Sequence, residues 1–407
     1  MITIDEAQRL IARYARPLAA RQVPLDEALG LVLAEAIASP VDSPPWDKSM
    51  VDGYAVVAAD LAAGPVELDV NEQVLAGATP SRPVLPGTAT RLMTGAPLPE
   101  GADAVVMVED TQALPADAPV PRTVRVLRGG IAAGKHILRR GTSMRTGDTV
   151  LAAGAIIRPA ELGLACELGL ERLGAIPRPS VAVLATGDEL VEPGEVPGPG
   201  QIRNSNGPML LAAVRRQGAT AIDLGIARDR IDDLRAAIER GLEADVLVLS
   251  GGVSAGVSDL VPQTLSEAGV EEVFHKVQLK PGKPLWFGVR GHSPRSTLVF
   301  GLPGNPVSSL VCFELFVRTA MQRLAGHAAV GPTTGHARLG HPHRQTGDRP
   351  TYFPAVVHQG PEGAVVETVA WQGSADLRGL VRANALAYFP AGDRQFEPGE
   401  RLEVIWL

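Results

Sequence analysis

The chain has 407 residues, of which 45% are hydrophobic and only 4% aromatic, and its formal net charge is -7. This length exceeds one ordinary hydrophobic core, so several domains with aliphatic interiors are expected. An acidic chain without a basic stretch offers no footprint for nucleic-acid phosphates, which argues against broad nucleic-acid binding.

Cysteine usage and the N-terminal sequence favour a cytoplasmic location. Cys166 and Cys312 form neither a CxxC pair nor a disulfide framework, which fits a reducing compartment. The opening MITIDEAQRL carries acids where a signal peptide carries Lys or Arg. Because no apolar run approaches the roughly 20 residues of a membrane helix, we expect no membrane contact.

The first 40 residues have helical spacing. Thr3 is expected as an N-cap, and Glu6 follows three residues later, which is the pattern of a capping box. A second run, PLDEALGLVLAEAIASP, predicts a helix over 24–40. These features predict a mainly helical N-terminal segment over 1–44.

Between 45 and 144 the pattern changes to short strands separated by Gly and Pro, such as VVMVED and TVRVL. Helical spacing returns in RPAELGLACELGLERLGA, which ends near Gly174. We therefore predict one discontinuous helical domain, 1–44 plus 145–177, around a β-rich insert at 45–144.

Strands and helices alternate over 178–326. The predicted strands SVAVLAT, TAIDLGIA and ADVLVLS are separated by the helical runs PMLLAAVRRQG and DDLRAAIERGLEA. Such alternation predicts a parallel sheet with helices on both faces. Residues 327–407 carry short strands such as YFPAVV and RLEVIWL, which predict a C-terminal barrel-like β domain.

Two glycine-rich motifs have several interpretations. GGIAAGK at 129–135 satisfies part of a P-loop, but His136 replaces the magnesium-binding Ser or Thr and a strand is predicted to follow, so a P-loop is disfavoured. LSGGVSAGVSDL at 249–260 fits a structural turn, a serine-hydrolase elbow with Ser254 as nucleophile, or a phosphate-binding turn. The elbow also needs a histidine in a suitable loop, and no candidate stands out among His275, His292, His341 and His343.

Residues at neighbouring strand ends favour the phosphate interpretation. Ligands of open α/β sheets bind at the carboxyl ends of the strands. Polar and charged side chains suited to a hard cation or an oxyanion follow the predicted strands. They are Thr186, Asp188 and Glu189 in ATGDEL, Asp259, and Lys280 and Lys283 in LKPGKPLWFG, with GLPGNPVSS opening a further helix.

Taken in order, these segments resemble the molybdopterin molybdenumtransferases, the family of the bacterial MoeA proteins and the gephyrin E domain. The resemblance covers essentially the whole chain. It depends on the motifs PPWDKSMVDGYAV, RLMTGAPLPEGADAVVMVED, ATGDEL, SGGVSAGVSD, KPGKPLWFG and GLPGNPVSS. The two N-terminal motifs distinguish this family from relatives that share only the parallel-sheet domain.

The resemblance implies a fold and a reaction. The fold is multidomain α/β and β, with a parallel-sheet molybdopterin-binding domain, a β-rich insert, a discontinuous helical domain and a C-terminal barrel-like domain. The substrates are adenylylated molybdopterin and molybdate, and AMP is released with Mg2+ present. The family also implies a homodimer, with the active site between the sheet domain of one subunit and the insert of the other. The upstream molybdopterin adenylyltransferase is a further expected partner.

The resemblance also implies roles for individual residues. The catalytic set is Asp52, Thr94, Glu189, Asp229 and Asp259, with Glu189 and Asp259 as expected Mg2+ ligands. The expected substrate- and phosphate-binding set is Thr186, Gly251, Gly252, Ser254, Asn305 and Ser308. Molybdate binding is expected at Lys280, Lys283, Arg349 and Ser374.

Two departures from the family pattern keep a second function in view. The family usually has DNSAMDGYA, whereas Lys48, Met50 and Val51 surround Asp52 here. A loop that commonly carries Gly-Glu-Asp has Gly-Thr-Ser at 141–143. The alternatives are therefore that Asp148 replaces the lost acid, or that the chain is a less active or binding-only relative that holds molybdopterin.

Overall fold

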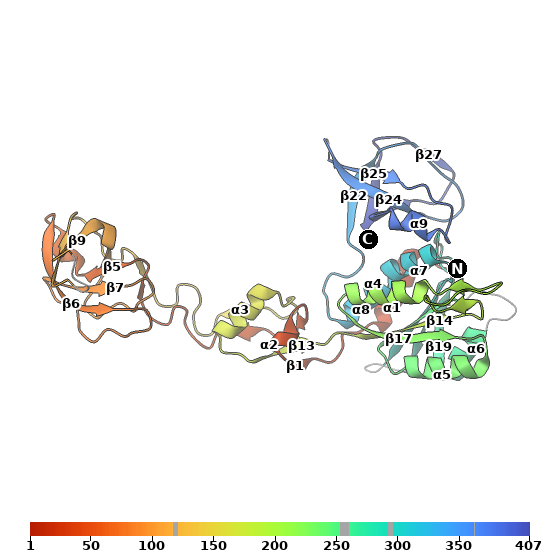
Figure 1. Ribbon diagram of the computed structural model, residues 1–407, viewed down its shortest axis with the longest axis horizontal. Coiled ribbons are helices and arrows are strands. Elements are labelled where there is room, and N and C mark those ends of the chain that lie inside the picture. Colours follow the sequence, from red (N-terminus) through yellow and green to blue (C-terminus); the bar gives the residue numbers. More distant parts are fainter. Residues whose placement is uncertain (117–120, 253–259, 292–295, 362) are drawn as a thin grey trace. The chain divides into compact units, whose positions relative to one another are not determined.

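The computed structural model describes residues 1–116, 121–252, 260–291, 296–361 and 363–407, which form two compact units (Figure 1). Unit 1 contains Met1–Glu35, Gly154–Leu162 and Glu171–Leu407, and unit 2 contains Ala36–Ala153 and Gly163–Leu170. The boundaries predicted for four separate domains stay a prediction. Within the described ranges, no helix is long and apolar enough to cross a membrane.

A six-stranded sheet organises unit 1, in the order β17-β14-β18-β21-β20-β19. Its strands are β14 (Ser180–Thr186), β17 (Thr220–Ala227), β18 (Val246–Ser250), β19 (Val270–His275), β20 (Trp286–Arg290) and β21 (Thr297–Leu302). Strands β17, β14, β18 and β21 pair in parallel, as predicted. Strands β19 and β20 are antiparallel, which the alternating pattern did not predict. Among the described residues, no helix separates β19, β20 and β21, and strands joined without a long crossover pair as antiparallel neighbours.

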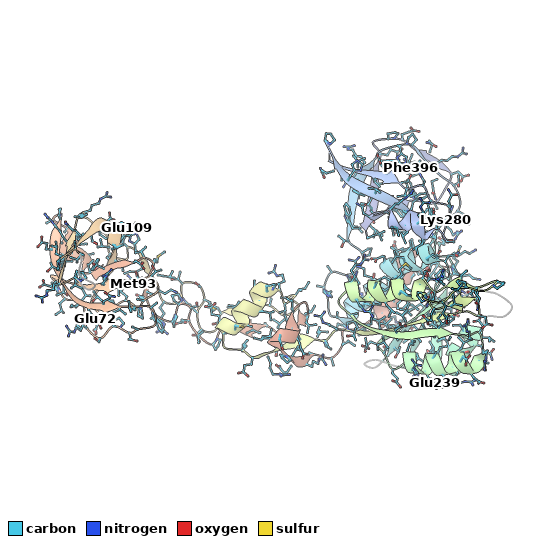
Figure 2. All side chains as sticks on the ribbon, in the orientation of Figure 1. Glu72, Met93, Glu109, Glu239, Lys280 and Phe396 are labelled. Carbon is cyan, nitrogen blue, oxygen red and sulfur yellow. The ribbon has the colours of Figure 1, made fainter. Side chains whose placement is uncertain are left out.

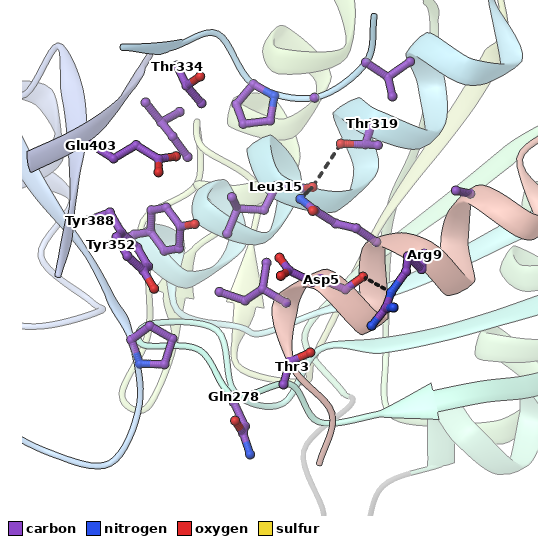
Figure 3. A pocket seen from close by; sticks show the side chains of 18 of the residues that line it. Thr3, Asp5, Arg9, Gln278, Leu315, Thr319, Thr334, Tyr352, Tyr388 and Glu403 are labelled. Carbon is purple, nitrogen blue, oxygen red and sulfur yellow. Dashed lines mark hydrogen bonds between the residues drawn. The ribbon is translucent and has the colours of Figure 1, made fainter. Parts of the chain in front are cut away.

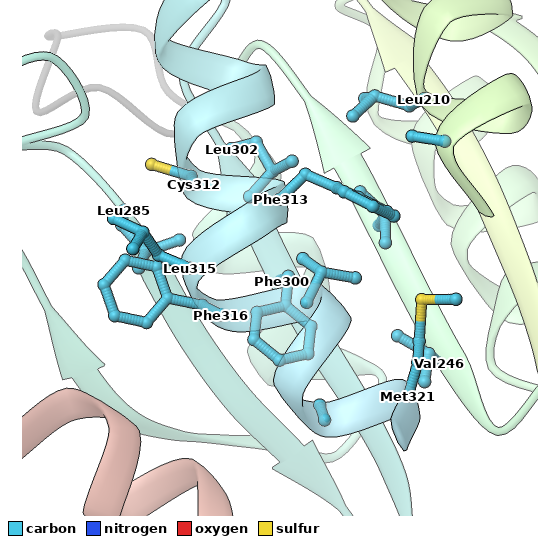
Figure 4. Packing of buried hydrophobic residues seen from close by; sticks show 14 of the residues in the cluster. Leu210, Val246, Leu285, Phe300, Leu302, Cys312, Phe313, Leu315, Phe316 and Met321 are labelled. Atoms are coloured by element: carbon cyan, nitrogen blue, oxygen red, sulfur yellow. The ribbon is translucent and has the colours of Figure 1, made fainter. Parts of the chain in front are cut away.

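Both faces of this sheet are covered because its side chains alternate between two apolar clusters. Along β14, Val181 and Val183 belong to the first cluster, and Ala182 and Leu184 belong to the second. The first cluster includes residues of α4 (Asn206–Arg216), α7 (Pro306–Cys312), a π-helix (Phe313–Val317) and α8 (Arg318–Leu324). The second includes residues of α5 (Ile231–Gly241) and α6 (Leu260–Glu267). Figure 4 shows the first cluster, where aromatic side chains of the sheet and of the π-helix lie together. Continuous aliphatic strands of this kind are typical of parallel sheets.

The N-terminal helix α1 (Ile4–Tyr14) begins as predicted. The Thr3 hydroxyl accepts a hydrogen bond from the Glu6 backbone N–H at 3.2 Å, which satisfies a free donor of the first turn. Ala7 and Ile11 lie one turn apart, are fully buried and belong to the first cluster. Helix α1 therefore packs beside α8 in unit 1.

The prediction of a helix over residues 24–40 is wrong. One helical turn forms, α2 (Leu25–Ala28), and the chain continues through β2 (Val32–Leu33) and β3 (Ile37–Ala38). Gly30 has a φ of 80°, a left-handed conformation that ends a helix. Strand β2 then pairs with β13 (Arg172–Ile176), so a partner distant in the sequence outweighs local helical spacing.

The helix predicted to end near Gly174 is shorter than expected. Helix α3 (Pro159–Glu167) ends at Glu167, and Gly169 follows with a φ of 75°. The remaining residues form β13, the middle strand of a three-stranded sheet in the order β1-β13-β2, with β1 (Arg21–Pro24) antiparallel to it. The segments around the insert therefore contain more strand than the sequence pattern predicted.

The C-terminal part of unit 1 is a closed barrel in the order β22-β25-β24-β26-β28, as predicted. Its strands are β22 (Thr334–Leu339), β24 (Thr351–Gly360), β25 (Gly363–Thr368), β26 (Ala385–Phe389) and β28 (Arg401–Trp406). The same part of the chain also contains a two-stranded sheet, β23 (His343–Gln345) with β27 (Arg394–Phe396), and helix α9 (Leu377–Val381). Val357, Val366 and Val404 are among the side chains of its interior. Closure pairs the barrel strands and so protects their edges.

Unit 2 contains a six-stranded sheet in the order β8-β5-β7-β6-β10-β9. Its strands are β5 (Gly53–Val56), β6 (Val66–Val74), β7 (Thr88–Leu92), β8 (Ala104–Met107), β9 (Thr111–Leu114) and β10 (Thr123–Val126). Two short pairs accompany it, β4 (Lys48–Ser49) with β11 (Ile137–Leu138), and β3 with β12 (Thr149–Leu151). Strand β11 follows Lys135 almost directly, so the 129–135 motif lacks the helix that a P-loop requires.

Candidate functional site

Four parallel strands of unit 1 have their carboxyl ends at one edge of the sheet. The last residues of these strands are Thr186, Ala227, Ser250 and Leu302. Gly251 and Gly252 follow β18 with φ values of 95° and 64°. A Cβ on Gly251 would lie 2.6 Å from the Thr186 carbonyl oxygen, so only glycine fits this close approach. Thr186 is 2% exposed, and in the described structure its hydroxyl has no hydrogen-bond partner.

Ser254 and Asp259 lie outside the described residues, so their expected roles stay predictions. Two downstream histidines have contacts typical of packing. His341 Nε2 lies 2.9 Å from Thr368 Oγ1, and the His343 ring stacks on Phe389 with centroids 4.0 Å apart. Burial also lowers the pKa of His343, which fits a neutral imidazole packed on the barrel.

Acidic side chains gather where β14 and β17 end. The Asp188 carboxylate accepts a hydrogen bond from the Asp229 backbone N–H at 3.1 Å, and Arg228 donates to the Asp188 carbonyl at 2.9 Å. Glu189 follows directly and is exposed, as Asp188 and Asp229 are. Among the described residues, no three His, Cys, Asp or Glu side chains form a group that could hold a metal ion by themselves.

The expected molybdate-binding residues meet at one open cavity of about 490 Å³ in unit 1. Figure 2 shows Lys280 where the sheet meets the C-terminal barrel. Residues from four separate stretches of sequence line this cavity, which we call the basic cavity. They are Lys280 and Lys283 in the first, Asn305 and Ser308 in the second, Arg349 in the third and Ser374 in the fourth.

Hydrogen bonds hold the walls of the basic cavity together. Asn305 Nδ2 donates to Ser374 Oγ at 3.0 Å, and the Ser374 carbonyl accepts the Val307 N–H at 3.0 Å. Arg349 Nη1 donates to the Leu279 carbonyl at 2.9 Å. The barrel therefore contributes to the cavity and also fixes the loops of the sheet domain that line it.

The lysine ammonium groups are available to a ligand. Both Lys280 and Lys283 are exposed, and neither side chain has a hydrogen-bond or ion-pair partner within the described part of the chain. The Lys280 backbone, by contrast, is held at both ends, because its N–H donates to Pro350 and its carbonyl accepts from Tyr352, each at 2.9 Å. An anion is the ligand that such unpaired cations attract.

The basic cavity also has an aromatic wall that the sequence patterns did not indicate. Phe353 and Trp371 line it, with their rings edge to face at a centroid distance of 4.9 Å. His343 packs edge-on against Phe353 at 5.0 Å. One side of the cavity therefore offers apolar surface beside the cations.

Asp52 and Thr94 lie in contact within unit 2, and their expected catalytic roles stay predictions. Asp52 Oδ1 accepts hydrogen bonds from both the Thr94 hydroxyl and its backbone N–H, each at 2.7 Å. These bonds stabilise the ionised carboxylate and hold the pKa of Asp52 below its ordinary value. Both side chains are exposed, so the carboxylate is open to a ligand.

Three family models together match most of the chain. They are the MoeA N-terminal region (domain I and II) over residues 2–169, the probable molybdopterin binding domain over 182–323, and the MoeA C-terminal region (domain IV) over 336–407. Molybdopterin molybdenumtransferase 2 of Mycobacterium tuberculosis is 41% identical over 338 residues, which covers 80% of each chain. The molybdopterin molybdenumtransferase of Bacillus subtilis is 32% identical over 100% of this chain and 94% of its own. This chain belongs to the molybdopterin molybdenumtransferase family.

Solved structures agree with this assignment. Two crystal structures of molybdopterin biosynthesis MoeA proteins from Pyrococcus horikoshii have TM-scores of 0.83 and 0.80, at 31% and 28% identity. Each comparison covers 100% of this chain and at least 99% of the other. The predicted family and multidomain fold are therefore confirmed.

The segments that depart from the family pattern lie in short strands and turns of unit 2. Lys48 lies opposite Leu138 in the β4–β11 pair, and Met50 is 55% exposed beside Asp52. The Asp148 carboxylate accepts the Arg145 N–H at 2.8 Å, so it is engaged in its own turn. Whether Asp148 replaces the missing acid stays a prediction.

A second cavity in unit 1, of about 800 Å³, lies elsewhere and contains none of the expected site residues. Figure 3 shows Asp5 and Glu403 facing it, together with the hydroxyl groups of Tyr352 and Tyr388. Burial is the main cause of the raised pKa of Tyr388, with further contributions from Glu403 and Asp5. The family assignment does not depend on this cavity.

Proposed function

We propose that this chain inserts molybdate into adenylylated molybdopterin and releases AMP, which completes the molybdenum cofactor. Family membership supports the transfer of molybdenum. The observation that carries the finer proposal is the basic cavity, where Arg349, two hydroxyl side chains and two lysines that have no partner among the described residues meet.

The chemistry of the basic cavity suits molybdate. Molybdate is a tetrahedral dianion, so the compact ammonium groups of Lys280 and Lys283 can balance its charge from different directions. The guanidinium of Arg349 and the hydroxyls of Ser308 and Ser374 add hydrogen-bond donors. None of these groups is a thiolate or an imidazole, so none would compete with the substrate as a ligand of molybdenum. The sulfur atoms of the substrate can therefore bind the metal.

The sheet edge suits the nucleotide end of the other substrate. The Gly251–Gly252 turn brings backbone close to the neighbouring strand end, where N–H groups can approach phosphate oxygens. Glu189 and Asp259 would hold Mg2+ there. Mg2+ commonly uses one or two carboxylates together with substrate phosphates, which fits the exposed acids at this edge. When bound, the ion would neutralise charge that develops as the phosphoanhydride is cleaved.

Asp52 is proposed as a catalytic carboxylate that Thr94 keeps ionised. A carboxylate is already ionised at neutral pH at its ordinary pKa, and the lowered pKa of Asp52 keeps it so, which suits it to accept a hydrogen bond from substrate. Thr94 also fixes the carboxylate orientation, since both of its donors reach the same oxygen.

We also propose that the protein acts as a homodimer and receives its substrate from the upstream molybdopterin adenylyltransferase. Family resemblance supports both proposals. Light scattering should give twice the chain mass of 42.6 kDa. A fully active species with the mass of one chain would contradict the dimer.

AMP release by the purified chain tests the proposed function. With adenylylated molybdopterin and Mg2+, we expect AMP formation that depends on molybdate, and Glu189→Gln should slow it at ordinary magnesium concentration. Product containing molybdenum should appear in step with AMP. Tight binding of both substrates without turnover would instead identify a binding-only relative.

A further inference from the structure

Asn206 links two loops of the sheet edge. It is the first residue of α4 and is only 8% exposed. Its side-chain Nδ2 donates to Ser250 Oγ at 2.8 Å and to the Gly304 carbonyl at 2.7 Å. The orientation of the amide is fixed, because a carbonyl oxygen can only accept and therefore requires the NH2 group opposite it. Both donors of one side chain are thus used, one on each loop.

The two linked loops contain the proposed subsites. Ser250 is followed by the Gly251–Gly252 turn, and Gly304 is followed by Asn305 of the basic cavity. A Cβ on Gly304 would lie 3.8 Å from Gly251 Cα, so the loops are in contact. The β18–β21 ladder ends at the pair Ser250 and Leu302, with one further hydrogen bond from Gly251 N–H to Leu302 at 3.2 Å. Beyond the end of this ladder, the Asn206 amide connects the two segments by its hydrogen bonds to Ser250 and Gly304.

The carbonyl oxygen of the same amide is unused. Asn206 Oδ1 is buried and has no hydrogen-bond partner among the described residues. A buried acceptor without a partner costs free energy, which an apolar residue at this position would avoid. The amide therefore does more than fill space at the start of the helix.

We infer that Asn206 is a positioning residue that sets the distance between the phosphate-binding turn and the oxyanion-binding loop. The inference rests on the proposed function, in which both substrates must be held together for the metal to be transferred. Misplacement of reacting groups by about 1 Å can cost on the order of 100-fold in rate. In this role Asn206 acts through its hydrogen bonds to Ser250 and Gly304.

Asn204 provides a matched control. It lies two residues earlier, is 6% exposed, and its Oδ1 accepts the Gly207 N–H at 2.9 Å within the same helix start. Asn204→Ala therefore removes a buried amide that stabilises α4 without joining the loops. Ser250→Ala removes one of the two Asn206 contacts and leaves the contact with Gly304.

The test compares binding with turnover in these variants. For Asn206→Ala and the isosteric Asn206→Asp, we expect kcat for AMP release to fall by about 100-fold. Molybdate binding by equilibrium dialysis and AMP binding by calorimetry should each stay within about twofold, because each subsite is intact. Asn204→Ala should lower Tm with kcat within about twofold, and Ser250→Ala should have an intermediate kcat.

Distinct results would overturn the inference. An unchanged kcat in Asn206→Ala, or losses of kcat and Tm equal to those of Asn204→Ala, would show that Asn206 only stabilises the helix. If Asn206→Ala does not fold, Asn206→Asp and Ser250→Ala decide the question by the same measurements. A wild-type chain that releases no AMP would refute the proposed function itself, which separates the two failures.

Discussion

Replacement of Lys283 by Met tests whether the basic cavity binds an oxyanion. The ammonium is exposed and, in the described structure, has no ion-pair or hydrogen-bond partner, so its charge does not hold the fold together. Methionine keeps an unbranched side chain of similar length and removes the charge. Because surface changes usually shift the free energy of unfolding by no more than about 0.5 kcal/mol, the variant should fold normally.

The expected loss of affinity follows from charge and exposure. At about 4 Å in a water-like medium, two unit charges interact by about 1 kcal/mol, so a lysine and a dianion interact by about 2 kcal/mol. The water-like value applies because the side chain is exposed to solvent. Since 1.4 kcal/mol corresponds to tenfold, Lys283→Met should weaken molybdate binding about 30-fold.

Equilibrium dialysis with molybdate measures this change directly. Arg215→Ala is the matched control, because it removes an exposed positive charge from the last turn of α4, whose first residue, Asn206, lies at the sheet edge. Nine residues of helix span about 14 Å, which exceeds the screening length of about 8 Å at physiological salt. Unchanged affinity in Lys283→Met, or an equal loss in Arg215→Ala, would refute the proposed direct contact.

Three further predictions concern other parts of the chain. Thr94→Val removes the hydroxyl donor to Asp52, so the pKa of Asp52 should rise toward its ordinary value. NMR titration would show protonation of Asp52 at higher pH than in the wild type, and an unchanged titration would contradict the role of Thr94. Glu314 is fully buried and forms an ion pair with Arg318 at 2.9 Å, so Glu314→Gln should lower the free energy of unfolding by about 3–5 kcal/mol. An unchanged midpoint of urea unfolding would contradict this stabilising role of the ion pair. Burial raises the pKa of the Cys312 thiol, so a thiol reagent at neutral pH should modify only the exposed Cys166 before unfolding; reaction of both in the folded protein would disprove this.

Local patterns were sufficient where a segment's own residues decide its structure. Thr3 and Glu6 predicted the start of α1, and aliphatic runs predicted β14, β17 and β18 with bounds close to those observed. In β14 and β18 such runs are decisive because a strand buried on both faces has few polar positions, whereas β17 lies at the sheet edge and has a single buried residue. The parallel order also placed the predicted acids and glycines at one edge, since the carboxyl ends of parallel strands lie together.

Tertiary contacts decided the remaining features. The helical spacing of residues 24–40 gave way to strand pairing with β13, a partner far along the chain. The antiparallel pairing of β19 and β20 came from connections without a crossover helix.

The candidate site shows the same division between sequence and structure. From the sequence, Lys280 and Lys283 were predicted to bind an oxyanion, but the contribution of Arg349 and Ser374 followed only from family resemblance. The structure brings the four residues to one cavity because the C-terminal barrel packs on the loops of the sheet. Asn206 has no signal in the sequence beyond that of a helix start, because its role depends on Ser250 and Gly304, which lie far from it in the chain. Sequence patterns report which segments are buried, whereas sheet order and barrel closure determine which loops meet.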